Sequence, residues 1–288
     1  MGVYIKLVAT MLIWGGTFIT GRILADGVSP YVAAFLRFFI ASIFLVLLTV
    51  KKDGKLPMPP KSQYIPLILL GLTGVFCYNI FFFKGLAHIP AARASLIIAN
   101  NPVCIALISA LVFKERLGKL ALLGIAISVS GAILVITEGH LTALSEFRLG
   151  PGEISIFICV ASWVSYSLIG KGVMKDVSPS ASVCYSSIIG TLFLLPPAIS
   201  HGLFTTAYTP AHLASLFYMG FFGTVLGFFW YYQGILAIGP SRAGIFINIV
   251  PVSAIALAWL MLGEPVGLSI CAGAALVITG VTLTNLSR

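Results

Sequence analysis

The chain has 288 residues and a formal net charge of +9, and 59% of its residues are apolar while only 9% are charged. A soluble domain carries roughly 25% charged residues, and the low charge here excludes a water-exposed globular surface. The composition therefore predicts an all-α integral membrane protein. In such a protein the excess of positive residues indicates membrane topology, and no nucleic-acid partner is expected.

Apolar runs long enough to cross a bilayer core of ~30 Å occur ten times along the chain. No small-residue cleavage site follows the first run, so we interpret it as a membrane span rather than a signal peptide. The runs form two groups of five, in residues 1–138 and 151–288, joined by a linker at 139–150. The predicted spans are 4–24, 31–50, 64–86, 91–112, 119–137, 152–174, 179–198, 211–236, 241–262 and 267–285.

The basic residues between the spans predict the orientation. With the N-terminus in the cytoplasm, the cytoplasmic segments carry twelve Lys and Arg residues and the opposite segments carry four. Because cytoplasmic loops are enriched in positive residues, both termini are expected in the cytoplasm. The expected location is the cell (inner) membrane, which the chain crosses several times.

The two groups of spans are related by an internal repeat. An offset of 149 residues superimposes Trp14 on Trp163 and Pro102 on Pro251 without a gap, and further Gly, Arg and Glu pairs follow the same offset. Matches of these residue types together indicate a duplication. Five spans per copy is an odd number, so the second copy must enter the membrane from the opposite side. Two inverted five-helix repeats are typical of secondary transporters.

Three stretches also carry a resemblance to a known family. They are "IWGGTFITGRILADGVSPYVAAFLRFF", "GLAHIPAARASLIIANNPVCIALISALVFKERL" and the looser second copy "ILAIGPSRAGIFINIVPVSAIALAWLMLGEPV". These resemble the EamA family of the drug/metabolite transporter superfamily, and the resemblance covers essentially the whole chain. It implies a fold of ten helices around a central cavity, lined mainly by helices 1, 3, 4, 6, 8 and 9. It also implies export of amino acids or other metabolites, without specifying a substrate.

Aromatic and amide side chains inside the apolar runs are the candidate substrate contacts. Trp14 and Thr17 share one helical face in the first span, as do Trp163 and Tyr166 in the sixth. An aromatic cavity can hold an ammonium group by cation–π contact, although aromatic residues also fill ordinary helix interfaces. The predicted substrate contacts are Trp14, Thr17, Tyr78, Asn79, Phe82, Asn101, Trp163, Tyr166, Trp230, Tyr231 and Asn248.

Two prolines and one arginine stand out inside the spans. Pro102 and Pro251 fall at equivalent depths of the fourth and ninth spans, and we interpret them as hinges, with static packing kinks as the alternative. Arg37 lies about two turns into the second span, with no acidic residue near it in the sequence. It either contacts a substrate carboxylate or serves the structure by snorkelling outward.

The other ionisable residues near the spans are expected to serve structure. Arg93 and Arg242 begin the fourth and ninth spans, while Glu115 and Glu264 precede the fifth and tenth, where a carboxylate stabilises the helix dipole. All eight acidic residues fall in loops or at span ends, the four histidines are also peripheral, and Glu153 lies near the outer end of the sixth span. Proton-coupled carriers usually keep a carboxylate or histidine within the membrane, and none is expected at the midplane here, so transport without obligatory proton coupling is predicted.

Together these features predict a secondary transporter that exports small organic metabolites by alternating access, with amino acids as the favoured class. One alternative is a multidrug or organic-cation efflux carrier, which would need a buried anionic site that the sequence lacks. Another is an intramembrane enzyme, for which the sequence has neither a metal-binding motif nor a nucleophile elbow. The expected partners are a small-molecule substrate and the lipid bilayer; no catalytic residue, metal or cofactor is predicted.

Overall fold

The computed structural model describes residues 2–53, 56–113, 118–139, 149–238, 243 and 246–286. Within these ranges the chain is helical and forms no strand, in agreement with the all-α class. Nine of the described helices are long and apolar enough to cross a membrane, and Phe246–Leu262 is a shorter apolar helix. Glu115, Arg242 and most of the predicted linker lie outside the described residues.

The first half of the chain supplies five of these long spans, and two of them are built from more than one helical segment. The elements are α1 (Gly2–Ala25), α2 (Pro30–Asp53), η1 (Lys61–Gln63), α3 (Tyr64–Leu70), η2 (Gly71–Cys77), α4 (Tyr78–His88), α5 (Ala91–Ile98), α6 (Asn101–Phe113) and α7 (Lys119–Ile136).

The second half follows the same order of helices, including the subdivided third and fourth members. The elements are α8 (Pro151–Val173), α9 (Pro179–Ser200), α10 (Pro210–Phe217), η4 (Tyr218–Leu226), α11 (Gly227–Ile238), η5 (Phe246–Asn248), α13 (Ile249–Leu262) and α14 (Leu268–Leu286).

Both halves contain a π-helical segment in their third span. These segments are η2 in the first half and η4 in the second, and the 149-residue offset places Gly71, the first residue of η2, on Gly220 within η4. π-Helices are rare and occur mostly next to functional sites. Their recurrence at matched positions is an irregularity that the sequence analysis did not predict.

The α-helix is irregular just before each predicted hinge proline: a turn at 99–100 precedes α6, and the 3-10 turn η5 leads directly into α13. The predicted span 91–112 is divided, because α5 ends at Ile98 and α6 begins at Asn101. Pro102 therefore lies in the first turn of α6, and Pro251 lies in the first turn of α13. A first-turn proline removes no intrahelical hydrogen bond, since its N–H would have no partner there. The chain thus avoids most of the cost of a proline in mid-helix.

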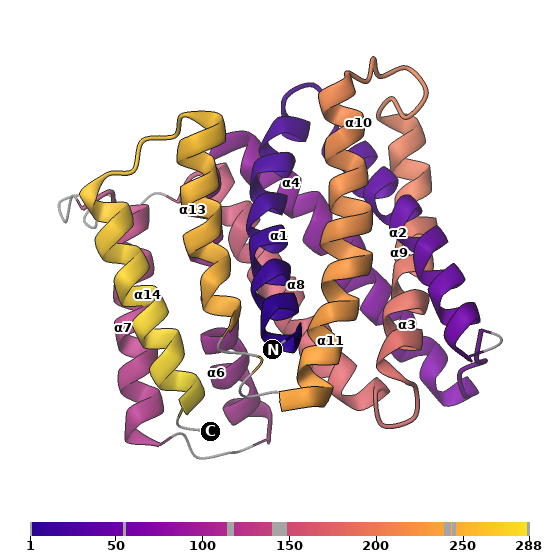
Figure 1. Cartoon of the computed structure of the whole chain (residues 1–288), viewed down its shortest axis with the longest axis horizontal. Helices are drawn as coiled ribbons and strands as arrows, with labels where there is room; N and C mark the ends of the chain where they lie inside the picture. Colours follow the sequence, from indigo (N-terminus) through magenta and orange to yellow (C-terminus); the bar gives the residue numbers. More distant parts are fainter. Residues whose placement is uncertain are drawn as a thin grey trace.

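The helices form one bundle with α1 near its middle and the pair α7 and α14 at one edge (Figure 1). The α7–α14 pair packs closely, because a Cβ atom on Gly124 would lie 2.6 Å from the carbonyl oxygen of Gly280. The beginning of α1 and the end of α14 lie toward the lower end of the bundle in Figure 1. We call this end the terminal end and the opposite one the far end.

Candidate substrate cavity

A cavity of about 470 Å³ lies among the helices of both halves. Its volume falls within the range of roughly 300–1,000 Å³ that is usual for pockets binding small organic molecules. Most of its wall is apolar or aromatic, with a few polar side chains from α1, α2, α4, α5, α6, α9, η4 and α14. Ten residues singled out from the sequence line it: Trp14, Thr17, Arg37, Tyr78, Asn79, Asn101, Pro102, Trp163, Tyr166 and Pro251.

The other four candidates do not line this cavity. Phe82 is buried against Phe18 at a ring-centroid distance of 5.3 Å. Tyr231 stands behind Trp14, with ring centroids 5.3 Å apart. The side-chain amide of Asn248 donates to the hydroxyl of Thr282 at 2.8 Å, and Trp230 is half-buried outside the lining. Direct substrate contact by these four residues stays a prediction.

The cavity also has polar lining residues that the sequence analysis missed. Ser186 and Ser187 come from α9, a helix outside the set that the family resemblance implied, and Asn285 comes from the last turn of α14. Thr224 enters the wall from the π-helix η4. Serine and threonine in apolar helices commonly bond to their own backbone, so their residue type alone did not indicate a cavity.

Polar side chains satisfy the backbone of the two π-helices beside the cavity. The amide of Asn79 donates to the carbonyl oxygens of Gly74 and Val75 at 3.3 and 2.9 Å. The hydroxyl of Thr224 donates to the carbonyl oxygen of Met219 at 3.0 Å. The indole N–H of Trp14 donates to the carbonyl oxygen of Gly223 at 2.9 Å, which fixes the ring against the wall.

Aromatic rings form one side of the cavity. The ring centroids of Tyr78 and Trp163 are 5.5 Å apart, and the rings of Trp163 and Tyr166 stack at 5.4 Å. Gly74 allows this packing, because a Cβ atom there would lie 2.2 Å from the ring of Tyr166. These π-faces can contact an apolar group or an ammonium group of a bound molecule.

Arg37 is the positively charged residue in the cavity wall, and it is 9% exposed. Its Nη1 donates to Oδ1 of Asn79 at 2.9 Å, while Nε and Nη2 lie 3.4 Å from Oγ1 of Thr224. Within the described part of the chain, no carboxylate forms an ion pair with it. A buried charge held only by neutral groups is costly, and an anionic ligand group would compensate it.

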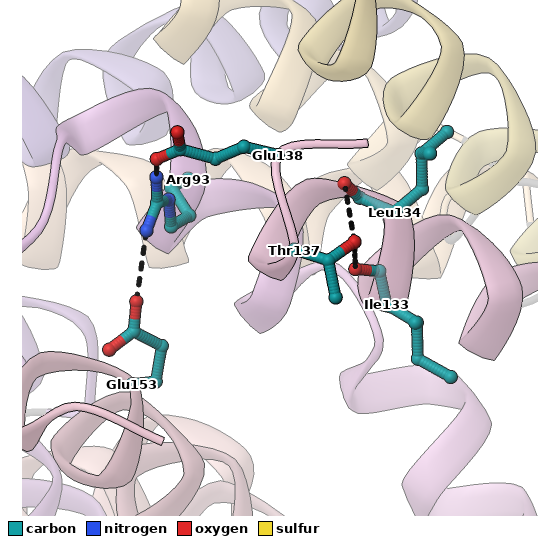
Figure 2. A network of polar contacts seen from close by, with 6 residues as sticks. All are labelled: Arg93, Ile133, Leu134, Thr137, Glu138 and Glu153. Carbon is teal, nitrogen blue, oxygen red and sulfur yellow. Dashed lines mark hydrogen bonds and ion pairs between the residues drawn. The ribbon is translucent and has the colours of Figure 1, made fainter. Parts of the chain in front are cut away.

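Charged residues near the far end hold the beginning of α5 in place (Figure 2). Arg93 pairs with Glu153 in the first turn of α8, with Nη1 and Oε1 3.0 Å apart, and also with Glu138 just after α7. The carboxylate of Glu264 accepts hydrogen bonds from the backbone N–H groups of Ala91 and Ala92 at 2.9 and 3.2 Å. We call Arg93, Glu138, Glu153 and Glu264 the α5 clamp.

One expectation about these residues changes. Glu264 was expected to stabilise the dipole of the tenth span, yet its carboxylate caps α5, because the loop after α13 brings it to that helix N-terminus. Glu153 is 7% exposed and ion-paired with Arg93.

A bundle of long apolar helices around a cavity of small-molecule size is the architecture of a multi-pass membrane protein. The sequence pattern of the EamA-like transporter family matches residues 1–137 and 150–286, and the chain belongs to this family. Membership places the chain among transporters rather than enzymes. It also agrees with the resemblance found in the sequence.

Individual relatives cover nearly the whole chain. The uncharacterized transporter YyaM of Bacillus subtilis is 29% identical over 98% of this chain and 92% of its own length. A probable terminal-alkyne amino-acid exporter of Streptantibioticus cattleyicolor is 32% identical over 97% of this chain and 92% of its own. A solved crystal structure that is 18% identical superposes with a TM-score of 0.66 over 99% of this chain and 96% of the other, which supports the fold.

Proposed function

We propose that this transporter exports small metabolites that carry a carboxylate group, amino acids foremost, across the cell (inner) membrane. The observation that carries the proposal is Arg37, a buried guanidinium in the cavity wall whose described partners are neutral side chains. Guanidinium groups bind carboxylates bidentately, and the aromatic side of the cavity suits an apolar side chain or an ammonium group. The Streptantibioticus relative, named as an amino-acid exporter, supports the same class.

Efflux of organic cations is the less favoured alternative. A cationic substrate would require a buried anion, and the described cavity wall contains no Asp or Glu. The positive charge of Arg37 would instead repel such a substrate.

Counterflow in liposomes tests the proposed substrate class. Purified protein is reconstituted into liposomes loaded with a series of matched compounds: an amino acid, its carboxamide and the amine without the carboxyl group. We expect exchange of labelled amino acid to be driven by compounds with a free carboxylate. Exchange driven equally well by the amine would contradict the proposal and favour cation efflux.

We further propose that the two halves are inverted repeats that support alternating access. Three observations support this: the gapless 149-residue offset, the π-helices at matched positions, and the breaks in regular α-helix before the two prolines, a turn before Pro102 and a 3-10 turn before Pro251. Carriers with inverted repeats alternate by moving one part against another around a fixed site. The breaks beside the cavity are where such motion would need the least rearrangement of backbone hydrogen bonds.

The hinge role predicts a defect in transport without a defect in folding. Pro102→Ala and Pro251→Ala should each insert normally, because alanine fits a first helical turn, while slowing exchange about two- to fivefold, which corresponds to roughly 0.4–1 kcal/mol. The measurement is initial counterflow rate per inserted protein. Pro196→Ala is the matched control, since Pro196 lies within α9 but outside the cavity lining. If both hinge variants exchange substrate at the parent rate, the two prolines are static packing kinks.

The orientation predicts which end of the protein meets the cytoplasm. Lys6 lies near the start of α1, Lys51 near the end of α2 and Lys119 at the start of α7, so all three lie at the terminal end. We therefore expect a cysteine placed at 138–150 to react with an impermeant thiol reagent applied to intact cells. A cysteine at 52–60 should react only after lysis. The native cysteines are replaced first, and the opposite labelling pattern would reverse the orientation.

A further inference from the structure

A second, smaller hollow lies away from the substrate cavity, between α2 and the η4–α11 helix. It has a volume of about 260 Å³ and is lined by apolar side chains and one lysine. Phe44, Leu47, Leu48 and Lys51 of α2 form one wall, and Phe221 and Phe229 stand opposite. We call this hollow the α2–α11 groove. It shares no lining residue with the substrate cavity.

The spacing of the α2 residues gives the groove its direction. Positions 44, 47, 48 and 51 follow the i, i+3, i+4, i+7 pattern of one helical face, so they form a stripe along the helix. Seven residues of helix extend about 10 Å. At the inner end of the stripe the rings of Phe44 and Phe221 meet edge to face at 4.8 Å. The groove therefore runs from these rings to Lys51, the last residue of the apolar span Pro30–Lys51.

The groove is open on its outer side, because Leu47 is 60% exposed and Phe229 is 43% exposed. Lys51 is exposed as well, and no hydrogen bond or ion pair is recorded for it within the described part of the chain. The sequence continues with Lys52, Lys55 and Lys61, with Asp53 as the one acidic residue among them. The outer end of an apolar groove thus meets a positively charged segment at the membrane boundary.

The charge, rather than the apolar wall, decides which lipid the groove can select. Lipid tails are as apolar as leucine, so an acyl chain gains only packing contacts when it leaves the bilayer for a protein groove. A lysine near the membrane surface attracts an anionic headgroup by about 1 kcal/mol, which is about fivefold in affinity. We propose that the α2–α11 groove binds an acyl chain of an anionic phospholipid whose phosphate headgroup lies against Lys51.

Native mass spectrometry of the purified protein tests this proposal without a transport assay. The full chain in neutral detergent is mixed with equal amounts of phosphatidylglycerol and phosphatidylcholine that have identical acyl chains. We expect the parent protein to retain about five times more of the anionic lipid. Lys51→Gln should bring the ratio close to one, and Lys51→Arg should keep it.

Lys61→Gln is the matched control, because Lys61 is an exposed lysine of the same segment outside the groove lining. It should leave the lipid ratio unchanged. Leu47→Trp, which places a larger side chain in the groove, should lower the retention of both lipids. Equal retention of both lipids by the parent protein would overturn the proposal. An equal loss of selectivity in Lys51→Gln and Lys61→Gln would also overturn it, since the attraction would then be a diffuse property of the segment.

Discussion

Arg37→Gln is expected to lower exchange of carboxylate substrates by about 10- to 100-fold, the largest effect of any single substitution in the cavity. Hydrogen bonds to charged groups contribute roughly 1.5–3 kcal/mol each, and glutamine can supply neither the charge nor the paired N–H donors. Arg37→Lys keeps the charge but loses the planar guanidinium group that can bond to both carboxylate oxygens, so an intermediate rate is expected. The measurement is the initial counterflow rate in liposomes at several substrate concentrations.

The control must separate loss of binding from loss of structure. Arg22→Gln removes the same group from α1, where Arg22 donates to the backbone carbonyl of Leu86 and lies outside the cavity lining. It should keep most of the parent rate. If Arg37→Gln transports the amino acid at the parent rate, Arg37 serves only to tie Asn79 to Thr224, and the carboxylate proposal fails.

Most of the fold could be predicted from the sequence because membrane helices are long, apolar and separated by polar turns. The limits of the spans agree with the described helices to within a few residues at most ends, as between the predicted span 179–198 and α9 (Pro179–Ser200). The irregular helices could not be predicted. A π-helix closes its hydrogen bonds over one residue more than an α-helix, and the stretches that form η2 and η4 are apolar like the rest of their spans.

The candidate site was predicted in part, for a related reason. Trp14, Trp163 and Tyr166 were placed in the cavity wall by helical spacing, which holds in a regular helix. Tyr231 and Phe82 were chosen by residue type near the same depth, and they form the layer behind the wall. Residue type does not determine which face of a helix meets the cavity when every neighbouring face is also apolar.

The α5 clamp gives the second large expected effect, on access to the cavity from the far end. Arg93 lies two residues before Ser95, which lines the cavity, and the partly buried pair with Glu153 holds the start of α5 against α8. Breaking a fully buried ion pair by removing one partner costs about 3–5 kcal/mol. A smaller cost is expected here, because the pair is only partly buried and Arg93 keeps Glu138 as a partner. We propose that this contact holds α5 against α8 in a state closed at the far end, and we expect Glu153→Gln to destabilise that state.

The readout is a cysteine at position 95 in a chain whose native cysteines have been replaced. In intact cells, Glu153→Gln should raise its labelling by an impermeant thiol reagent at least tenfold, since 1.4 kcal/mol already shifts a two-state population tenfold. Glu138→Gln is the matched control, because it removes the other carboxylate that pairs with Arg93. The side chain of Glu138 is 62% exposed. Exposed pairs contribute about 0–1 kcal/mol, so labelling should rise less than about fivefold. Equal labelling in both variants would show that burial of the Arg93–Glu153 pair does not hold the far end closed.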